Sequence, residues 1–230
     1  MFSKPVNASV SLRVLARLLA YPDAQLRGQL PALRDALHAE QAFTPRRLAE
    51  LDALIVALSG RTDGLDVEAA YVELFDRGRA TSLHLFEHVH GDSRDRGPAM
   101  IDLAQTYEKA GLYLAPGELP DYLPVVLEFV STQPPREARE FLAEMAHIFN
   151  AIFSALQQRD SAYASVLGAL LELAGETAQS VKIAPDEPLD DSWAEPVVFD
   201  GCSSKGQARP GQAQPIHILR KDIPVKGAAA

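Results

Sequence analysis

Apolar residues recur at every third or fourth position between residues 138 and 156, and this stripe constrains the fold more than any other feature of the 230-residue chain. Such spacing places the side chains on one face of a helix, which needs a partner to pack against. We interpret the stripe as the core of a helical bundle, with a groove for a partner's helix as the alternative. Its members are Ala138, Phe141, Leu142, Met145, Ile148, Phe149, Ile152, Phe153 and Leu156.

The rest of the chain shows no persuasive strand alternation, so we expect helices along most of its length. Serine, threonine and aspartate are preferred N-cap residues, so we expect helices to begin at Ser9 or Ser11, at Thr44 and at Asp66. The proline that follows Thr44 is also favoured as the first residue of a helix. Pro31 predicts either a kink or two short helices, because proline cannot donate the helical hydrogen bond. The expected helices span about 9–21, 23–38, 44–60, 66–75, 81–88, 98–110, 124–129, 135–156 and 163–175.

The composition changes from about Pro185 onward, where proline, aspartate, glycine, glutamine and serine dominate. Such a segment buries too little apolar surface to offset the entropy lost on ordering. The prediction is therefore an all-α, single-domain helical bundle over residues 1–180, followed by a poorly ordered tail over residues 181–230.

Charge and composition exclude several classes of protein. A formal net charge of −9 argues against a nucleic-acid binder, whose phosphate contacts need a basic face, and favours a basic partner. No apolar run is long enough to span a membrane, and the first residues do not resemble a secretory signal. The single cysteine, Cys202, cannot form an intramolecular disulfide. We therefore expect a cytoplasmic protein without direct membrane insertion.

Residues 71–97 hold four arginines, five acids, three histidines and three glycines. His84 and His88 are four residues apart, as two metal ligands on a helix would be, but no complete ligand set follows from the spacing, and we predict no metal site. The arginines could bind a phosphate group, although the interleaved acids favour an ion-pair network between helices. Ser82 lies near His84 without the glycine-flanked turn of a serine nucleophile. No catalytic residue is assigned.

A second group of polar residues lies between residues 114 and 124. Glu118 and Asp121 flank Pro120, and Tyr122 follows. The two acids either cap the next helix or accept a basic residue of a partner.

Both regions closely resemble the NarJ family, the "delta subunit" assembly chaperones of respiratory nitrate reductase, over about Val10 to Leu173. The resemblance implies that the motif residues are structural or contact a partner, and that the second region is a candidate partner-binding site. The family motif comprises Tyr71, Leu74, Phe75, Asp76, Arg77, Gly78, Arg79, Glu87, His88, His90, Gly91, Arg94 and Arg96. The candidate partner-binding residues are Glu118, Pro120, Asp121 and Tyr122.

The resemblance implies a TorD-like helical chaperone, a monomer or weak homodimer, that is not an enzyme and carries no cofactor of its own. Such proteins bind the apo catalytic (alpha) subunit, including its N-terminal segment, while molybdenum cofactor is inserted. Proteins that deliver the cofactor are further candidate partners. Tyr122 stands where a histidine is often found in the wider group, which argues against any role that needs imidazole there.

The alternative hypothesis is a ligand- or metal-binding enzyme that uses the histidines and arginines of residues 77–96. From the residues themselves, we expect Tyr71, Leu74 and Phe75 to pack in the core. We expect Arg77, Arg79, Asp92 and Arg94 to hold the loop against neighbouring helices.

Overall fold

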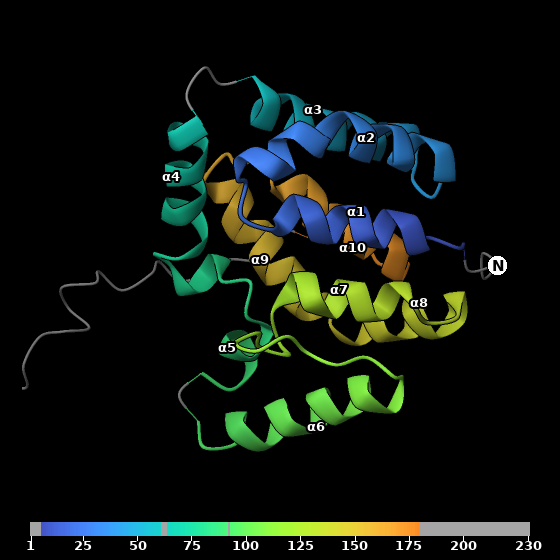
Figure 1. Ribbon diagram of the computed structural model, residues 1–230, viewed down its shortest axis with the longest axis vertical. Coiled ribbons are helices and arrows are strands. Elements are labelled where there is room, and N and C mark those ends of the chain that lie inside the picture. The colour runs from blue at the N-terminus through green and yellow to red at the C-terminus, as the bar shows by residue number, and fades with distance from the viewer. Residues whose placement is uncertain (1–5, 61–63, 92, 180–230) are drawn as a thin grey trace, which may run out of the picture. The chain divides into compact units, whose positions relative to one another are not determined.

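A computed structural model describes residues 6–60, 64–91 and 93–179, and this part of the chain is helical (Figure 1). The prediction of an all-α fold is confirmed. The expected tail, residues 181–230, lies outside the described residues. The elements are α1 Ser9–Leu19, α2 Ala24–Glu40, α3 Pro45–Ser59, α4 Gly64–Phe75, a 3-10 turn η1 Arg79–Thr81, α5 Leu85–Val89, α6 Arg96–Lys109, α7 Leu123–Ser131, α8 Pro135–Glu144, α9 Ala146–Gln158 and α10 Ala164–Ala174.

The core forms around α10, which is buried on nearly every side because it is apolar around most of its circumference. Helices α8 and α9 pack against it from one part of the chain, and α1 and α3 from another. Helix α1 also lies along α7 and α2, so the first helix joins the two halves of the bundle (Figure 1).

The apolar stripe of residues 138–156 is confirmed as core. Its members are buried or partly buried against the core. The chain turns at Met145, where φ is −92° and ψ is 0°, so the stripe is divided between α8 and α9. Two helices that meet at an angle can thus cover both α10 and the region near η1.

Helix starts predicted from capping residues are confirmed only in part. The Thr44 hydroxyl accepts the N–H of Arg47 at 3.4 Å, as predicted. Asp66 was expected to cap α4, but it lies inside the first turn of that helix. Helix α2 runs unbroken through Pro31, so the alternative of two short helices is wrong.

The start of α1 is capped from a distance. Helix α1 begins at Ser9, and neither Ser9 nor Ser11 caps it, so a cap by either serine is wrong. The Asn7 side chain accepts the N–H of Ser9 at 3.3 Å. Instead, the Glu40 carboxylate accepts the N–H groups of Val10 at 3.0 Å and Ser11 at 2.6 Å. A negative charge at a helix N-terminus is favourable, so the end of α2 stabilises the start of α1.

The helix expected over residues 81–88 is much shorter in the structure, where α5 begins only at Leu85. His84 pairs with Tyr122 in an antiparallel bridge, which holds the preceding residues in an extended conformation. Helix α6, in contrast, begins two residues earlier than expected, at Arg96.

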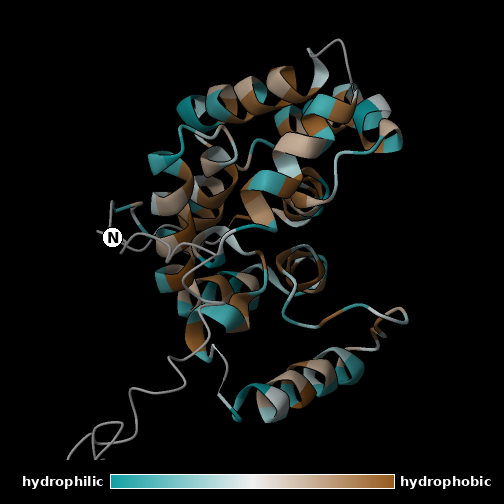
Figure 2. Cartoon of the chain, turned by 90° about the vertical axis from the view of Figure 1, so that its left-hand side faces the viewer, coloured by the Kyte–Doolittle hydropathy of each residue, from teal (hydrophilic) through white to brown (hydrophobic). Residues whose placement is uncertain are grey.

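Helix α6 is the least enclosed of the long helices in the described part of the chain. Its one buried side chain is Tyr107. Figures 1 and 2 place it at the bottom of the bundle, and Figure 2 shows polar and apolar residues alternating along it. No helix within the described residues combines the length and apolar character that crossing a membrane requires.

Candidate functional site

The segment between α6 and α7, residues 110–122, is called the connector here, and it lies against the family motif. The N–H of Leu123 donates to Leu83 O at 2.8 Å, and the N–H of Leu85 donates to Asp121 O at 3.0 Å. The Tyr107 hydroxyl donates to Pro120 O at 2.8 Å. The two regions singled out in the sequence are therefore brought together over residues 82–86 and 120–123.

Asp121 is the centre of this junction, and its side chain is 0% exposed. One carboxylate oxygen lies 3.3 Å from Nδ1 of His84, and the other accepts the N–H of Phe86 at 3.2 Å. The Arg96 guanidinium lies 3.8 Å away. A buried carboxylate needs such compensation, because an isolated charge is costly away from water.

One expectation was that Asp121 caps the helix that follows it, α7, and this is wrong. Helix α7 begins after Tyr122 without a side-chain cap, whereas the Asp121 carboxylate binds an N–H in the first turn of α5. Its side chain is also shielded from solvent. Pro120 is likewise buried, so these two residues position the connector.

The two histidines that are four residues apart in sequence have different partners. The hydrogen bond to Asp121 is the main reason that the pKa of His84 is raised, and the negative charges of Asp121 and Glu87 act in the same direction. His88 donates Nε2–H to Ser82 O at 2.9 Å, and burial lowers its pKa.

His84 also precedes α5, so the two rings do not share a helix face. Among the described residues, no group of three or more histidines, cysteines and acids is placed to hold a metal ion. The spacing that suggested a metal site therefore does not translate into a ligand set.

Charged residues of the motif pair with one another. Arg96 lies 3.5 Å from Glu87, and Arg77 lies 2.9 Å from Glu73. Arg94 is exposed, and Asp92, which was expected to help hold the loop, lies outside the described residues. The ion-pair network between helices that the sequence favoured is present only around Arg96, which lies near Glu87 and Asp121. The Arg77 pair is made with a residue four positions earlier at the surface, so it does not hold the loop against a neighbouring helix.

Gly91 adopts φ +52°, and a Cβ at this position would lie 2.8 Å from the Arg79 guanidinium. The left-handed backbone favours glycine there, whereas the arginine side chain could move aside for a Cβ. His90 packs edge-on against Phe86, with ring centroids 5.3 Å apart.

Part of the motif lines a polar hollow of about 500 Å³, which we call the motif cleft. Its lining residues are Phe75, Asp76, Arg77, Gly78, Arg79, Ser82, His84, Glu87 and Arg96. The cleft therefore combines ion pairs with few apolar surfaces.

The aromatic residues of the motif pack against one another, and Phe75 also lines the cleft. The Tyr71 hydroxyl donates to Leu19 O at 2.7 Å, and its ring lies 4.7 Å from that of Phe75. Tyr122 is half-buried, with its hydroxyl 3.5 Å from that of Tyr71 and its ring 5.3 Å from that of His84. Burial raises the pKa of Tyr122. The phenol is therefore neutral at physiological pH and contributes as a packing and hydrogen-bonding group.

Leu74 is half-buried, and its carbonyl accepts a hydrogen bond from Thr81 and one from Arg159 at 3.3 Å. These bonds connect the end of α4 to η1 and to the end of α9.

Glu118 is exposed, and its carboxylate accepts the N–H of Ala115 at 3.0 Å, which closes a turn of the connector. It also lines a second hollow of about 370 Å³, here called the α1–α7 groove. The groove lies between α1, α7 and the connector. Its apolar residues are Tyr107, Leu112, Leu114, Val125 and Phe129, and its charged residues are Arg13, Arg17, Glu118 and Glu128.

The sequence analysis did not identify this groove. The helical spacing of Val125, Phe129 and Thr132 was the available signal, but the return of the connector onto α7 has no sequence signature.

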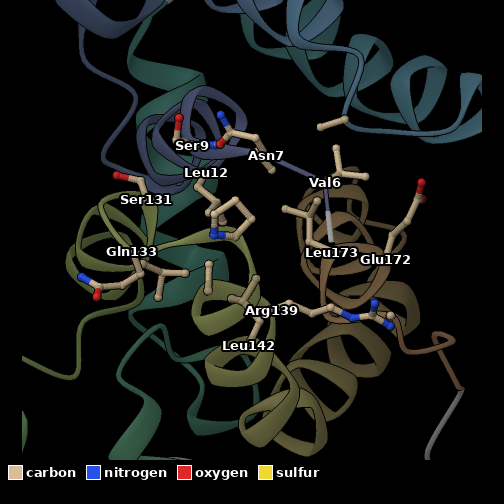
Figure 3. Close-up of a pocket in the computed structure, with 16 residues that line it drawn as sticks. Val6, Asn7, Ser9, Leu12, Ser131, Gln133, Arg139, Leu142, Glu172 and Leu173 are labelled. Carbon is tan, nitrogen blue, oxygen red and sulfur yellow. The ribbon is translucent and has the colours of Figure 1, made fainter. Parts of the chain in front are cut away.

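A third hollow lies between the start of α1, α8 and the end of α10 (Figure 3). Leu12, Leu142 and Leu173 contribute apolar walls, and Arg139 and Glu172 lie at its edge (Figure 3). Its volume of about 130 Å³ is below the roughly 300–1,000 Å³ of ligand pockets, so we assign it no function.

Comparison with known proteins identifies the family. A model of the nitrate reductase delta subunit family matches residues 20–168. The nitrate reductase molybdenum cofactor assembly chaperone NarJ of Escherichia coli (strain K12) is 45% identical over 203 residues, which cover 87% of this chain and 84% of that protein. NarW of the same strain is 41% identical over 184 residues, covering 79% of this chain and 76% of that protein.

A solved structure supports the fold. A crystal structure described as that of a redox enzyme maturation protein from Archaeoglobus fulgidus superimposes with a TM-score of 0.54 and 19% identity. The match covers 76% of this chain and 98% of that one. NarJ and NarW are named as assembly chaperones and not as catalysts, which agrees with the prediction that the chain is not an enzyme. The chain belongs to the nitrate reductase delta subunit family, as the motif at residues 71–97 predicted.

Proposed function

We propose that this chain is a cytoplasmic chaperone that binds the apo catalytic (alpha) subunit of a respiratory nitrate reductase, including the N-terminal segment of that subunit. It holds the subunit while molybdenum cofactor is inserted and is not part of the mature enzyme. Proteins that deliver the cofactor are further partners in this proposal, and the chaperone acts as a monomer or weak homodimer.

The identity of 45% with NarJ of E. coli over 87% of the chain is the observation on which this proposal mainly depends. The physical properties of the chain support it. A net charge of −9 favours association with a basic segment, and an apolar groove can hold the hydrophobic residues of an incompletely assembled protein.

Within the candidate partner-binding residues, we propose a division of roles. Glu118 is exposed and can meet a basic group of the partner, and Tyr122 offers a half-buried aromatic surface. Asp121 and Pro120 are buried and hold these two in position. The motif residues hold the connector against α5, because their charges and hydrogen bonds are directed mainly toward one another.

The proposal is tested by co-purification from cells that express the catalytic subunit together with the tagged chaperone. In cells unable to make molybdenum cofactor, the apo subunit should co-purify with the chaperone. In cells that make the cofactor, the loaded subunit should be recovered in much smaller amount. Equal recovery of the two forms, or recovery of neither, would contradict the proposal.

A matched experiment tests whether the chaperone recognises the N-terminal segment of the catalytic subunit. A catalytic subunit that lacks its N-terminal segment should co-purify less efficiently than the complete subunit. Undiminished recovery would mean that the chaperone recognises another part of the subunit.

A further inference from the structure

A hollow of about 340 Å³ lies between α3, α4 and the turn from α9 to α10, and we call it the α3–α4 hollow. Helix α3 packs mainly on α2 and α10, whereas α4 contacts η1, so the two helices leave space between them. Figure 1 shows α4 at the left edge of the bundle. The floor of the hollow consists of side chains that are at most 8% exposed, namely Leu54, Leu58, Val67, Tyr71 and Tyr163.

The rim of this hollow is apolar and open to solvent. Ala57 of α3 and Ala70 of α4 line the hollow and are exposed. On the same two helices, Val56 is 64% exposed and Leu65 is 70% exposed. Single apolar residues at a surface are ordinary, but here they adjoin a hollow with an apolar floor. Such a patch is typical of a surface that another molecule covers.

Helix α4 is held in place by contacts away from the hollow. The Glu68 carboxylate lies 3.0 Å from the Arg27 guanidinium and accepts the Tyr21 hydroxyl at 2.9 Å. The hollow is therefore formed before anything binds, and a surface that is already ordered loses less entropy on association.

The hollow carries a charge of each sign at opposite ends of α4. Asp66 is exposed in the first turn of the helix and forms no ion pair with another described residue. Arg159 is also exposed, and its Nη1 lies 3.3 Å from Leu74 O, near the C-terminal end of the helix. Leu74 follows Asp66 by eight residues, which corresponds to about 12 Å along a helix axis.

We infer that the α3–α4 hollow is the surface through which a second copy of this chain binds. In a two-fold dimer the same patch meets itself, so the two α4 helices lie antiparallel. Asp66 of each copy then faces Arg159 of the other, and Val56 and Leu65 are covered. A ligand with charge of one sign would satisfy only one end of the hollow. This inference rests on the proposed function and adds the surface of its weak homodimer.

The surface also explains why the dimer is weak. One helix face and two ion pairs bury little area, which is typical of transient interfaces. Exposed ion pairs contribute little free energy, so the apolar rim supplies the affinity and the charges fix the orientation. The hollow shares no lining residue with the motif cleft or the α1–α7 groove. Dimerisation and binding of the catalytic subunit therefore use different surfaces.

Sedimentation equilibrium of the full-length chain over a range of concentrations tests the inference. The wild type should show reversible association of monomers into dimers. Ala70→Arg places a long charged side chain at the middle of the surface, next to its own copy across the two-fold axis, and should weaken association about tenfold or more. Ala32→Arg is the matched control, because Ala32 is an exposed alanine of α2. It should leave association unchanged.

Exchange of charge provides a second measurement. Asp66→Lys gives a surface with two positive charges, and Arg159→Glu gives one with two negative charges. Each variant alone should associate more weakly than the wild type, because like charges would face each other in both pairs. An equimolar mixture of the two variants should form heterodimers, since both pairs then have opposite signs. A purely structural effect of the substitutions would not be reversed by mixing.

Each outcome supports or overturns the inference. A wild type that stays monomeric would contradict it together with the homodimer of the proposed function, while co-purification of the catalytic subunit would be unaffected. Dimers of Ala70→Arg and Asp66→Lys as stable as the wild type would place the interface elsewhere. Both are exposed positions, so they decide the matter even if Arg159→Glu fails to fold. Folded single variants that do not associate on mixing would overturn the two-fold arrangement.

Discussion

Asp121 is the residue on which the arrangement of the connector depends most. Its buried carboxylate joins His84, the backbone of α5 and Arg96, which come from three consecutive parts of the motif. Glu118, only three residues earlier, is exposed and binds within the connector itself. Two acids that look equivalent in the sequence therefore have different physical roles.

Asp121→Asn should lower the free energy of unfolding by about 1–3 kcal/mol, because the interactions with His84 and Arg96 lose their charge while the acceptor for Phe86 remains. Glu118→Gln should change it by less than about 0.5 kcal/mol, since the side chain is exposed and keeps an acceptor. Urea denaturation of both variants measures the difference. Equal stability of the two would mean that the buried carboxylate contributes little.

Phe75→Ala should lower the free energy of unfolding by more, about 3–5 kcal/mol, because Phe75 is 5% exposed and packs against Tyr71 and Tyr163. Thermal unfolding gives the comparison with wild type. A change within about 0.5 kcal/mol, typical of surface substitutions, would contradict burial of the ring.

His84 and His88 should affect the pH dependence of stability with opposite sign. The pKa of His84 is raised in the folded state, so its stabilising contribution is complete below the ordinary pKa of about 6.5 and is lost as pH rises through the folded value. The pKa of His88 is lowered, so its contribution favours folding above about 6.5 and is lost as pH falls through that value toward the folded pKa.

His84→Gln should therefore be more destabilising near pH 6 than near pH 8, and His88→Gln more destabilising near pH 8 than near pH 6. Denaturant titrations at the two pH values measure these differences. The same sign for both histidines would contradict the assigned environments.

At the scale of elements, helices differ in how they are anchored. Helix α10 is surrounded by other helices, and α1 is capped by the end of α2. Helix α6 depends on Tyr107, whose ring is 2% exposed, and on the ion pairs of Arg96 at its start. An element with so few buried contacts opens more readily than the core.

Tyr107→Ala should release α6, with a loss of about 3–5 kcal/mol in stability and faster amide exchange over residues 96–109 than in α10. Ile101→Ala is the control, since Ile101 is on the same helix and is 59% exposed. Hydrogen-exchange mass spectrometry distinguishes local release from global unfolding. Unchanged exchange in α6 would show that other contacts hold the helix.

At the scale of the whole molecule, the net charge of −9 and the apolar groove make different contributions to binding. Salt screens exposed charges beyond about 10 Å at 0.1 M, whereas apolar contacts are much less affected. Complex formation should therefore depend only partly on ionic strength. The proposed boundary near residue 180 stays a prediction, which limited proteolysis with mass analysis of the products can test.

Affinity for the N-terminal peptide should fall as salt rises but remain measurable, and Glu118→Gln should reduce the salt dependence. Calorimetry at low and high salt gives both quantities for the wild type and the variant. Affinity independent of salt would remove electrostatic steering from the proposed mode of recognition.

The sequence by itself determined the features that depend on neighbouring residues. The apolar stripe of residues 138–156, the cap at Thr44 and the helix end at Gly175 were all predictable, because helical periodicity and capping act within a few positions. The family resemblance also singled out residues 71–97 and 118–122 as the candidate regions. It did not distinguish the buried residues of these regions from the exposed ones.

Tertiary structure decided the features that join distant residues. Glu40 caps a helix about 30 residues earlier in the chain, and Asp121 is buried against residues about 35 positions earlier. The bridge from His84 to Tyr122 replaces part of an expected helix with extended backbone. Hydrogen bonds and burial of this kind depend on which segments meet in space, and local propensity carries no information about that. The α1–α7 groove is of the same kind, because it exists only where the connector returns to α7.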